Sequence, residues 1–217
     1  MGRPRVHDDA TAETLLAVAS DLLYAEGMES LSVRRVADAA GTSHRAVYAL
    51  FGSKRGLLDA LAAFGYDDLA GRVSRLEATS DPAADLVRAG TVAFRRFASS
   101  RPALFRLAFE EISPEAVEQP RVAHAALASY RALAAWFTRL REAGLVHPAR
   151  TDADCIFAFH ATCHGLAASE RAAKPPPEGP GFWRVTGPSV FDAVWTDTLA
   201  SVVRGFALPP EPTAGAG

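Results

Sequence analysis

The chain has 217 residues, of which 49% are hydrophobic and 22% are charged, a composition typical of globular proteins and unlike that of disordered or fibrous chains. It has no run of the ~18 apolar residues that a membrane helix needs, and no apolar stretch follows the basic N-terminal residues, so we expect neither a membrane helix nor a secretory signal. Two cysteines, Cys155 and Cys163, are too few for a disulfide framework or a four-cysteine zinc site, and we expect a protein of the reducing cytoplasm.

Positive charge gathers in the first quarter of the chain. The formal net charge of −2 excludes a uniformly basic nucleic-acid binder. Residues 30–58 nevertheless contain only one anion, Asp38, against the cations Arg34, Arg35, Arg45, Lys54 and Arg55. Arg3 and Arg5 add positive charge at the N-terminus. We therefore expect a polyanionic partner to bind this part of the chain.

Helical periodicity dominates from the N-terminus onward, and strand alternation is scarce. A first helix is predicted over residues 10–26, capped by Asp8 or Asp9 and ended by Gly27. Two short helices are predicted over residues 33–40 and 43–50, with a turn at Gly41 between them. A fourth helix begins after Ser53 and runs to about residue 78.

Proline, glycine and aspartate mark the ends of the later helices, which are predicted over residues 83–98, 102–110, 120–143, 152–172 and 188–206. Asp81 and Asp152 are the expected N-caps. The proline-rich residues 174–181 are expected to form an exposed connection. We therefore predict an all-α protein with an N-terminal three-helix domain over residues 1–55, a larger helical body over 56–208 and a disordered tail over 209–217.

The two short helices carry the pattern of a helix-turn-helix motif. Ala37 is small where the helices would nearly touch, and Gly41 permits a positive φ in the turn four residues later. Apolar residues point back into a small core from both helices, namely Val36, Ala40, Val47 and Leu50. A second helix exposed in this way fits the major groove of B-form DNA, with its N-terminal residues facing base edges.

The positions of this motif that are not needed for its core are predicted to contact DNA. Arg45 can form a bidentate pair with guanine, and His44 can donate or accept at a base edge. Thr42, Tyr48, Ser32, Arg34 and Lys54 are placed for phosphate oxygens. Arg3 and Arg5 lie on an N-terminal arm that can follow a minor groove.

Residues 10–62 resemble the DNA-binding domain of the tetracycline-repressor (TetR) family of bacterial transcriptional regulators. The resemblance is carried by residues 15–27, 31–37, 40–43, 47–51 and 53–58. Its most diagnostic features are Tyr48, Phe51 three residues later, and Ser53-Lys54 before an apolar pair. Residues 101–107 and 164–166 resemble one class of C-terminal domain in the family much more weakly.

The resemblance implies a homodimer whose two reading helices bind a pseudo-palindromic operator in double-stranded DNA. It assigns base readout to Thr42, Ser43, His44 and Arg45, with Tyr48 and Lys54 on phosphate. The pair His44-Arg45 departs from many members, which have a small residue at one of these positions, so the operator sequence does not follow from relatives. The resemblance also implies a C-terminal body that dimerises and binds a small effector, and repression as the default mode of regulation.

The last two predicted helices have wide apolar faces that favour a dimer interface, with candidate residues Phe157, Cys163, Val194, Trp195 and Val202. The same faces would also suit burial within one subunit. Candidate walls of an effector pocket are Phe64, Phe94, Phe97, Phe105, Phe109, Trp136 and Phe137, with His160 as a polar contact. These aromatic residues would also suit a plain core, whereas as pocket walls they indicate an apolar or aromatic effector.

The sequence carries only weak signals of a metal site or an enzyme. His160 and His164 have the helical spacing of zinc ligands, but the glutamate of a metalloprotease motif is missing between them, and we expect no metal and no cofactor. No serine elbow and no glycine-rich phosphate loop is present, so we do not expect an enzyme. A helical metal- or ligand-binding protein that uses its basic tip for non-DNA partners is the remaining alternative.

Overall fold

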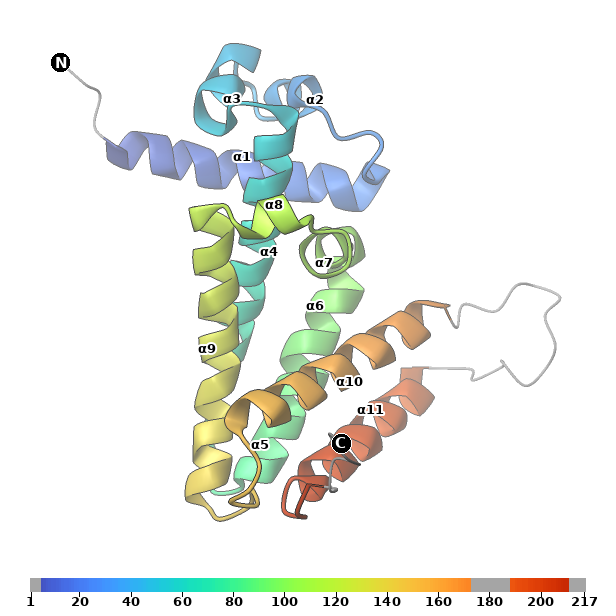
Figure 1. Cartoon of the computed structure of the whole chain (residues 1–217). Coiled ribbons are helices and arrows are strands. Elements are labelled where there is room, and N and C mark those ends of the chain that lie inside the picture. Colours follow the sequence, from blue (N-terminus) through green and yellow to red (C-terminus); the bar gives the residue numbers. More distant parts are fainter. Residues whose placement is uncertain (1–4, 173–187, 211–217) are drawn as a thin grey trace, which may run out of the picture. The chain divides into compact units, whose positions relative to one another are not determined.

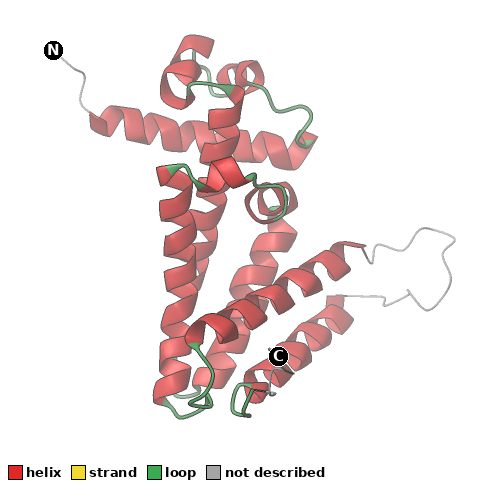
Figure 2. Cartoon of the chain, viewed as in Figure 1, coloured by secondary structure: helices red, strands yellow, loops and turns green. Residues whose placement is uncertain are grey.

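The computed structural model describes residues 5–172 and 188–210, and within them every regular element is a helix (Figure 2). Figure 1 labels the elements, which are α1 (Arg5–Glu26), α2 (Val33–Ala39), α3 (His44–Phe51), α4 (Lys54–Ser74), α5 (Pro82–Arg88), the π-helical η1 (Ala89–Phe94), α6 (Arg95–Ser100), α7 (Pro102–Phe109), α8 (Pro114–Val117), α9 (Pro120–Glu142), α10 (Asp152–Ala172) and α11 (Pro188–Gly205). The all-α prediction is confirmed. None of the described helices is both long enough and apolar enough to cross a bilayer.

Most of the predicted start and stop signals act as expected. The Ser32 hydroxyl accepts a hydrogen bond from the backbone N–H of Arg35 at 3.2 Å and so caps α2. Asp81 caps α5 by accepting from the N–H groups of Ala83 and Ala84, each at 3.0 Å. Gly27 and Gly41 have φ angles of +81° and +63°, which explains why glycine stands at these two helix ends.

Several predicted boundaries were wrong. Helix α1 begins at Arg5 and not at residue 10, so Asp8 and Asp9 are not at its N-cap position. Helix α4 ends at Ser74, earlier than predicted, and the short α8 was not predicted. The hydroxyl of Thr151, and not Asp152 as predicted, caps α10 by accepting from the N–H of Asp154 at 3.1 Å. The predicted connection at 174–181 and residues 211–217 of the predicted tail lie outside the described residues.

The helices form two compact units. The first unit contains the described residues up to Leu69 together with Ser100–Ser129, and the second contains Ala70–Ser99 together with the described residues from Tyr130 onward. Packing therefore joins α7, α8 and the start of α9 to the N-terminal helices, whereas the functional division predicted at residue 55 stays a prediction.

The core of the first unit explains the helix-turn-helix arrangement. Leu15, Leu16 and Leu23 of α1 are fully buried, as are Val36 of α2 and Val47 of α3. Phe51 is also buried, whereas Leu50, the predicted core residue beside it, is only half-buried. Phe51 therefore belongs to α3 and anchors its C-terminal end in the core.

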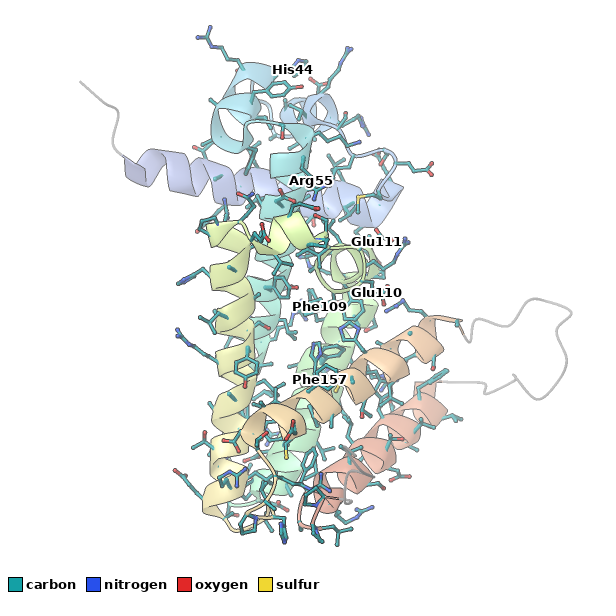
Figure 3. All side chains as sticks on the ribbon, in the orientation of Figure 1. His44, Arg55, Phe109, Glu110, Glu111 and Phe157 are labelled. Carbon is teal, nitrogen blue, oxygen red and sulfur yellow. The ribbon has the colours of Figure 1, made fainter. Side chains whose placement is uncertain are left out.

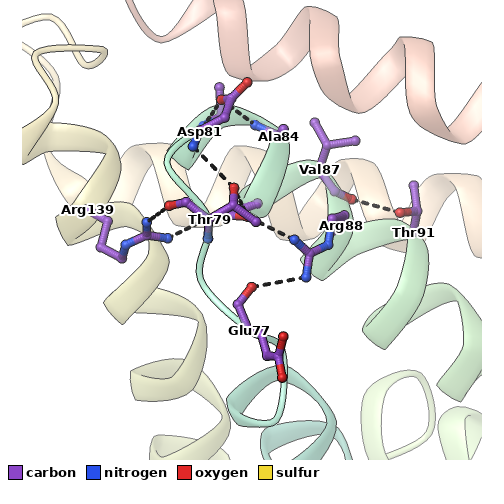
Figure 4. Close-up of polar contacts among 10 residues, drawn as sticks. Glu77, Thr79, Asp81, Ala84, Val87, Arg88, Thr91 and Arg139 are labelled. Carbon is purple, nitrogen blue, oxygen red and sulfur yellow. Dashed lines mark hydrogen bonds and ion pairs between the residues drawn. The ribbon is translucent and has the colours of Figure 1, made fainter.

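The second unit is held by close packing and by a buried polar network. Gly90 lies where η1 meets α10 and α11 so closely that an added Cβ would clash with Leu199 and lie 3.1 Å from Phe159 Cζ. Beside it, the carboxylate of Asp85, only 1% exposed, accepts from Thr79 Oγ1 at 2.8 Å and from Arg139 Nη1 at 2.6 Å. Figure 4 shows how Thr79, Arg88 and Arg139 converge there. This network ties α5 to α9.

Candidate nucleic-acid interface

The α2–α3 pair has the backbone geometry that its sequence predicts. The turn closes with hydrogen bonds from the N–H of Thr42 to the Ala37 carbonyl at 2.9 Å and from the N–H of Gly41 to the Asp38 carbonyl at 3.2 Å. Ala37 is fully buried between the helices, so a larger side chain there would push them apart. Because α2 and α3 also pack on α1, the position of α3 is fixed by both neighbouring helices (Figure 1).

The outer face of α3 is polar and accessible. His44, Arg45, Tyr48 and Ala49 are exposed, and Figure 3 shows His44 on the side of the α2–α3 pair that faces away from α1. The side chain of Arg45 makes no hydrogen bond or ion pair with any described residue. Its guanidinium is therefore available for a partner. Ala49 lies one turn after Arg45 on the same face and was not singled out from the sequence; a methyl group at such a position suits a thymine methyl.

Two of the predicted base readers, Thr42 and Ser43, are less accessible to DNA than the others, because one is half-buried and the other caps α3. The Ser43 hydroxyl caps α3 by accepting from the N–H of Ala46 at 3.1 Å. Thr42 is only half-buried and lines a shallow hollow with Thr11 and Thr14 of α1. The cap uses one of the two acceptor lone pairs of Ser43 and fixes its side chain, whereas His44 and Arg45 have no capping role and are the more versatile readers.

Asp38 is a charged residue of this surface whose role the sequence did not reveal. Its carboxylate lies 3.4 Å from His44 Nε2 and 3.8 Å from Arg34 Nε. All three side chains are at least half-exposed, so these contacts orient the groups more than they stabilise the fold. Asp38 therefore positions His44 and Arg34, and its own charge opposes an approaching phosphate.

The predicted phosphate contacts surround α3. Ser32 begins α2, Tyr48 is 52% exposed, and Lys54 is exposed at the start of α4. Arg3 lies outside the described residues, while Arg5 is the first residue of α1 and so belongs to a helix and not to the arm predicted from the sequence. The contacts of all these residues with DNA stay predictions.

Two arginines connect α1 and α4 to α7 and α8 within the first unit. Arg101, just before α7, donates from Nη1 to the buried hydroxyl of Ser20 on α1 at 2.7 Å and lies 3.8 Å from Asp68 on α4. Arg55, in the first turn of α4, bonds to Ser113 and lies 3.7 Å from Glu115 of α8 (Figure 3). No motif signals these long-range pairs. These contacts link α1, α4, α7 and α8 through polar side chains.

The predicted pocket residues fall into two groups. Phe64, Phe105 and Phe109 belong to the first unit, where the rings of Phe105 and Phe109 stack with centroids 5.3 Å apart. Phe94, Phe97, Trp136, Phe137 and His160 belong to the second unit. Phe97, Phe105 and Phe137 have no exposed surface. A role of either group in effector binding stays a prediction.

His160 and His164 are half-buried neighbours with ring centroids 4.7 Å apart, and Phe94 contacts both. Burial, and then repulsion from His164, lowers the pKa of His160 to about 4, so its imidazole is neutral at physiological pH. Burial also raises the pKa of Cys163 far above its usual range. The described residues contain no group of three or more His, Cys, Asp or Glu side chains that could hold a metal ion.

The predicted interface residues divide into exposed and internal ones. Phe157 is 74% exposed and Val194 is 40% exposed, and Val202 is half-buried. Cys163 and Trp195 are buried inside the second unit, where the indole Nε1 of Trp195 donates to Glu170 at 2.8 Å. Their assignment to a face that touches another subunit was therefore wrong, because periodicity marks an apolar stripe without telling which neighbour covers it.

The fold and this surface define a helix-turn-helix DNA-binding protein with a helical C-terminal body, and comparisons with known proteins narrow the class. A family model described as bacterial regulatory proteins of the tetR family matches residues 15–61, and a model of a tetracycline-repressor-like C-terminal domain matches residues 87–180. The chain belongs to the TetR family of transcriptional regulators, with a DNA-binding domain and a ligand-binding domain.

Solved structures agree with this family. A Rhodococcus sp. RHA1 protein of unknown function is 28% identical over 91% of this chain and 96% of its own, with a TM-score of 0.73. A TetR variant from Acinetobacter baumannii AYE in complex with minocycline is 25% identical over 89% and 94%, with a TM-score of 0.59. The regulator PfmR from Thermus thermophilus, at 22% identity over 88% and 97% with a TM-score of 0.58, shares the fold. No curated protein matches the sequence.

Proposed function

We propose that the protein is a dimeric, sequence-specific repressor that acts in the cytoplasm, binds a pseudo-palindromic operator, and leaves it when a small, apolar or aromatic effector binds. The observation that carries the DNA-binding part is the exposed face of α3, where Arg45 has no partner among the described residues. A guanidinium there can form a bidentate pair with guanine in the major groove.

A dimer is supported by the apolar surface that α10 and α11 leave exposed. Phe157 is exposed on α10, and Val190 and Val194 are exposed on α11. Large apolar side chains at this level of exposure favour association, and two helices from each subunit would bury them in a four-helix interface. Two copies related by a two-fold axis would present two reading helices to half-sites ~34–36 Å apart.

Release by an effector follows from population shift. A ligand that binds more tightly to a conformation with the wrong spacing of reading helices moves the dimer toward that conformation, and operator affinity falls by the same coupling factor. The minocycline complex of the Acinetobacter protein is one instance of ligand binding in a related fold. Repression itself is proposed as a steric block of the promoter.

The test begins by selecting an operator from random duplexes with the full-length protein and then measuring affinity by fluorescence anisotropy. We expect Arg45→Ala to weaken operator binding by ~1–3 kcal/mol and to relax the preference at one base position. Lys54→Ala should weaken all duplexes to a similar extent, because a phosphate contact carries no sequence information. The control is Arg131→Ala, an exposed arginine on α9, which should change neither quantity.

Salt dependence separates DNA binding from binding of the basic tip to an acidic protein. Operator affinity should fall steeply as salt rises while sequence preference survives, because released counterions drive the phosphate contacts. Parent affinity and parent specificity in both the Arg45 and Lys54 variants would refute the assignment of these residues. Failure to select any operator would refute sequence-specific DNA binding.

A further inference from the structure

A groove in the second unit lies between α5 and α11 and has a volume of about 440 Å³. Its apolar lining consists of Ala83, Ala84 and Val87 from α5 and Ala200 and Val203 from α11. Three of these side chains are single methyl groups, and their small size is what leaves the space open between two helices that contact each other. The volume falls within the range of small-molecule sites. None of the aromatic residues predicted to form a pocket lines this groove.

The two arginines of the groove differ in how many hydrogen bonds they already make within the protein. Arg88 already donates to the carboxylate of Asp85 at 3.0 Å and to the carbonyl of Glu77 at 3.0 Å. Arg204, at one end of the lining stretch of α11, has no carboxylate partner among the described residues and donates only to the hydroxyl of Ser201 at 2.9 Å. A planar guanidinium with free N–H groups beside an apolar channel matches an anion that is joined to an apolar chain.

Ala200, which lines the groove, lies on a different side of α11 from Val194, one of the residues proposed for dimerisation. Val194 and Ala200 are six residues apart, which corresponds to about 240° around a helix with 3.6 residues per turn. Val194 is exposed, while Ala200 lines the groove. A second subunit bound over Val194 would therefore leave the groove open to small molecules.

We propose that this groove binds a linear aliphatic carboxylate, with the carboxylate on Arg204 and the alkyl chain along α5 and α11. The lining stretch of α11 runs from Thr196 to Arg204, a rise of eight residue steps that spans ~12 Å, the reach of an extended chain of about nine carbons. A carboxylate fits a single guanidinium through two parallel hydrogen bonds. The alanine and valine side chains of the groove fit an alkyl chain, and of its two threonines Thr91 already donates its hydroxyl to the Val87 carbonyl at 3.0 Å. The proposal does not depend on DNA binding, because every residue in it belongs to the second unit.

Calorimetry on the full-length protein with decanoate, below its micelle concentration, tests the proposal. We expect saturable binding of decanoate, much weaker binding of decanol, and none of acetate, because both the charge and the chain are required. Arg204→Gln should weaken decanoate binding about tenfold or more, and Arg204→Lys should lose less. The control Arg96→Gln removes an exposed arginine of α6 and should leave the affinity unchanged.

The position of the chain is tested separately. Ala200→Phe fills the groove and should abolish binding, whereas Ala135→Phe, at an exposed position of α9, should not. A photoreactive diazirine analogue of decanoate should label peptides of α5 and α11, as read by mass spectrometry. No decanoate binding, binding that survives both the Arg204 and Ala200 substitutions, or labelling confined to other helices would each overturn the proposal. Operator binding by unliganded Arg204→Gln is measured in parallel, so a failure of this site is distinguished from a failure of the proposed function.

Discussion

The buried carboxylate of Asp85 allows a sharp test of what holds the second unit together. Four donors converge on it within 3.0 Å, namely the N–H and hydroxyl of Thr79, Arg88 Nη1 and Arg139 Nη1. The substitution Asp85→Asn keeps the shape of the side chain but removes its charge. It also replaces one acceptor oxygen with an NH₂ group that faces donors, so at least one donor loses its partner.

The expected cost lies between two limits. Breaking a fully buried ion pair by changing one partner destabilises a protein by about 3–5 kcal/mol, whereas an exposed pair contributes about 0–1 kcal/mol. The carboxylate is fully buried, but the side chains of Arg139 and Arg88 are 30% and 37% exposed, so water can solvate part of each guanidinium after the change. We therefore expect Asp85→Asn to lower the free energy of unfolding by about 2–3 kcal/mol.

The assay is urea unfolding followed by circular dichroism at one fixed protein concentration, because a dimer gains stability by mass action. Asp81→Asn is the matched control: it changes an aspartate four residues away whose only role in the network region is to cap α5, and asparagine caps helices equally well. We expect Asp81→Asn to stay within ~0.5 kcal/mol of the parent. Equal stability of the two variants would refute the reasoning.

The pH dependence of Asp85 has a definite sign. Burial by itself would raise the pKa of Asp85, but the hydrogen bonds from Arg139 and Thr79 outweigh it, and the pKa is lowered. A group with a lowered folded-state pKa stabilises the protein above its unfolded pKa, ~3.9 for aspartate, and this stabilisation is lost as pH falls through the folded value. The difference between the parent and Asp85→Asn should therefore be constant near neutrality and shrink below about pH 4. A constant difference down to pH 3 would contradict this assignment.

Three further substitutions test the packing of η1 and α10 and the titration of His160. Gly90→Ala should destabilise the protein by about 1–3 kcal/mol in the same urea assay, because its Cβ would clash with Leu199. Gly165→Ala, whose Cβ meets nothing within 4 Å, should raise stability by ~0.4–1 kcal/mol, and the opposite order would contradict the packing described for η1. His160 has a folded pKa of about 4 and an unfolded value of 6.5, so its contribution is complete above pH 6.5 and is lost as pH falls toward 4. His160→Phe should flatten the stability profile in that window, and an unchanged slope would show that other groups titrate there.

The sequence by itself was enough to predict the class of fold and the exposed face of α3, because these depend on local signals. Ser32 and Gly41 act through hydrogen bonds and backbone angles within a few residues, so their roles could be inferred without the rest of the chain. The exposure of Arg45 also follows locally, because the period of α3 buries Val47 and Phe51.

Only the tertiary structure decided which apolar stripes are internal and which polar groups are paired. Periodicity could not tell that Trp195 is buried while Val194 next to it is exposed, since both lie on apolar stripes of one helix. It also could not reveal the reach of Arg101 to Ser20, 81 residues away in the chain, or the opening between Ala83 and Ala200. These features depend on which helices become neighbours, and that choice is made by the summed packing of the whole chain, which no single segment specifies.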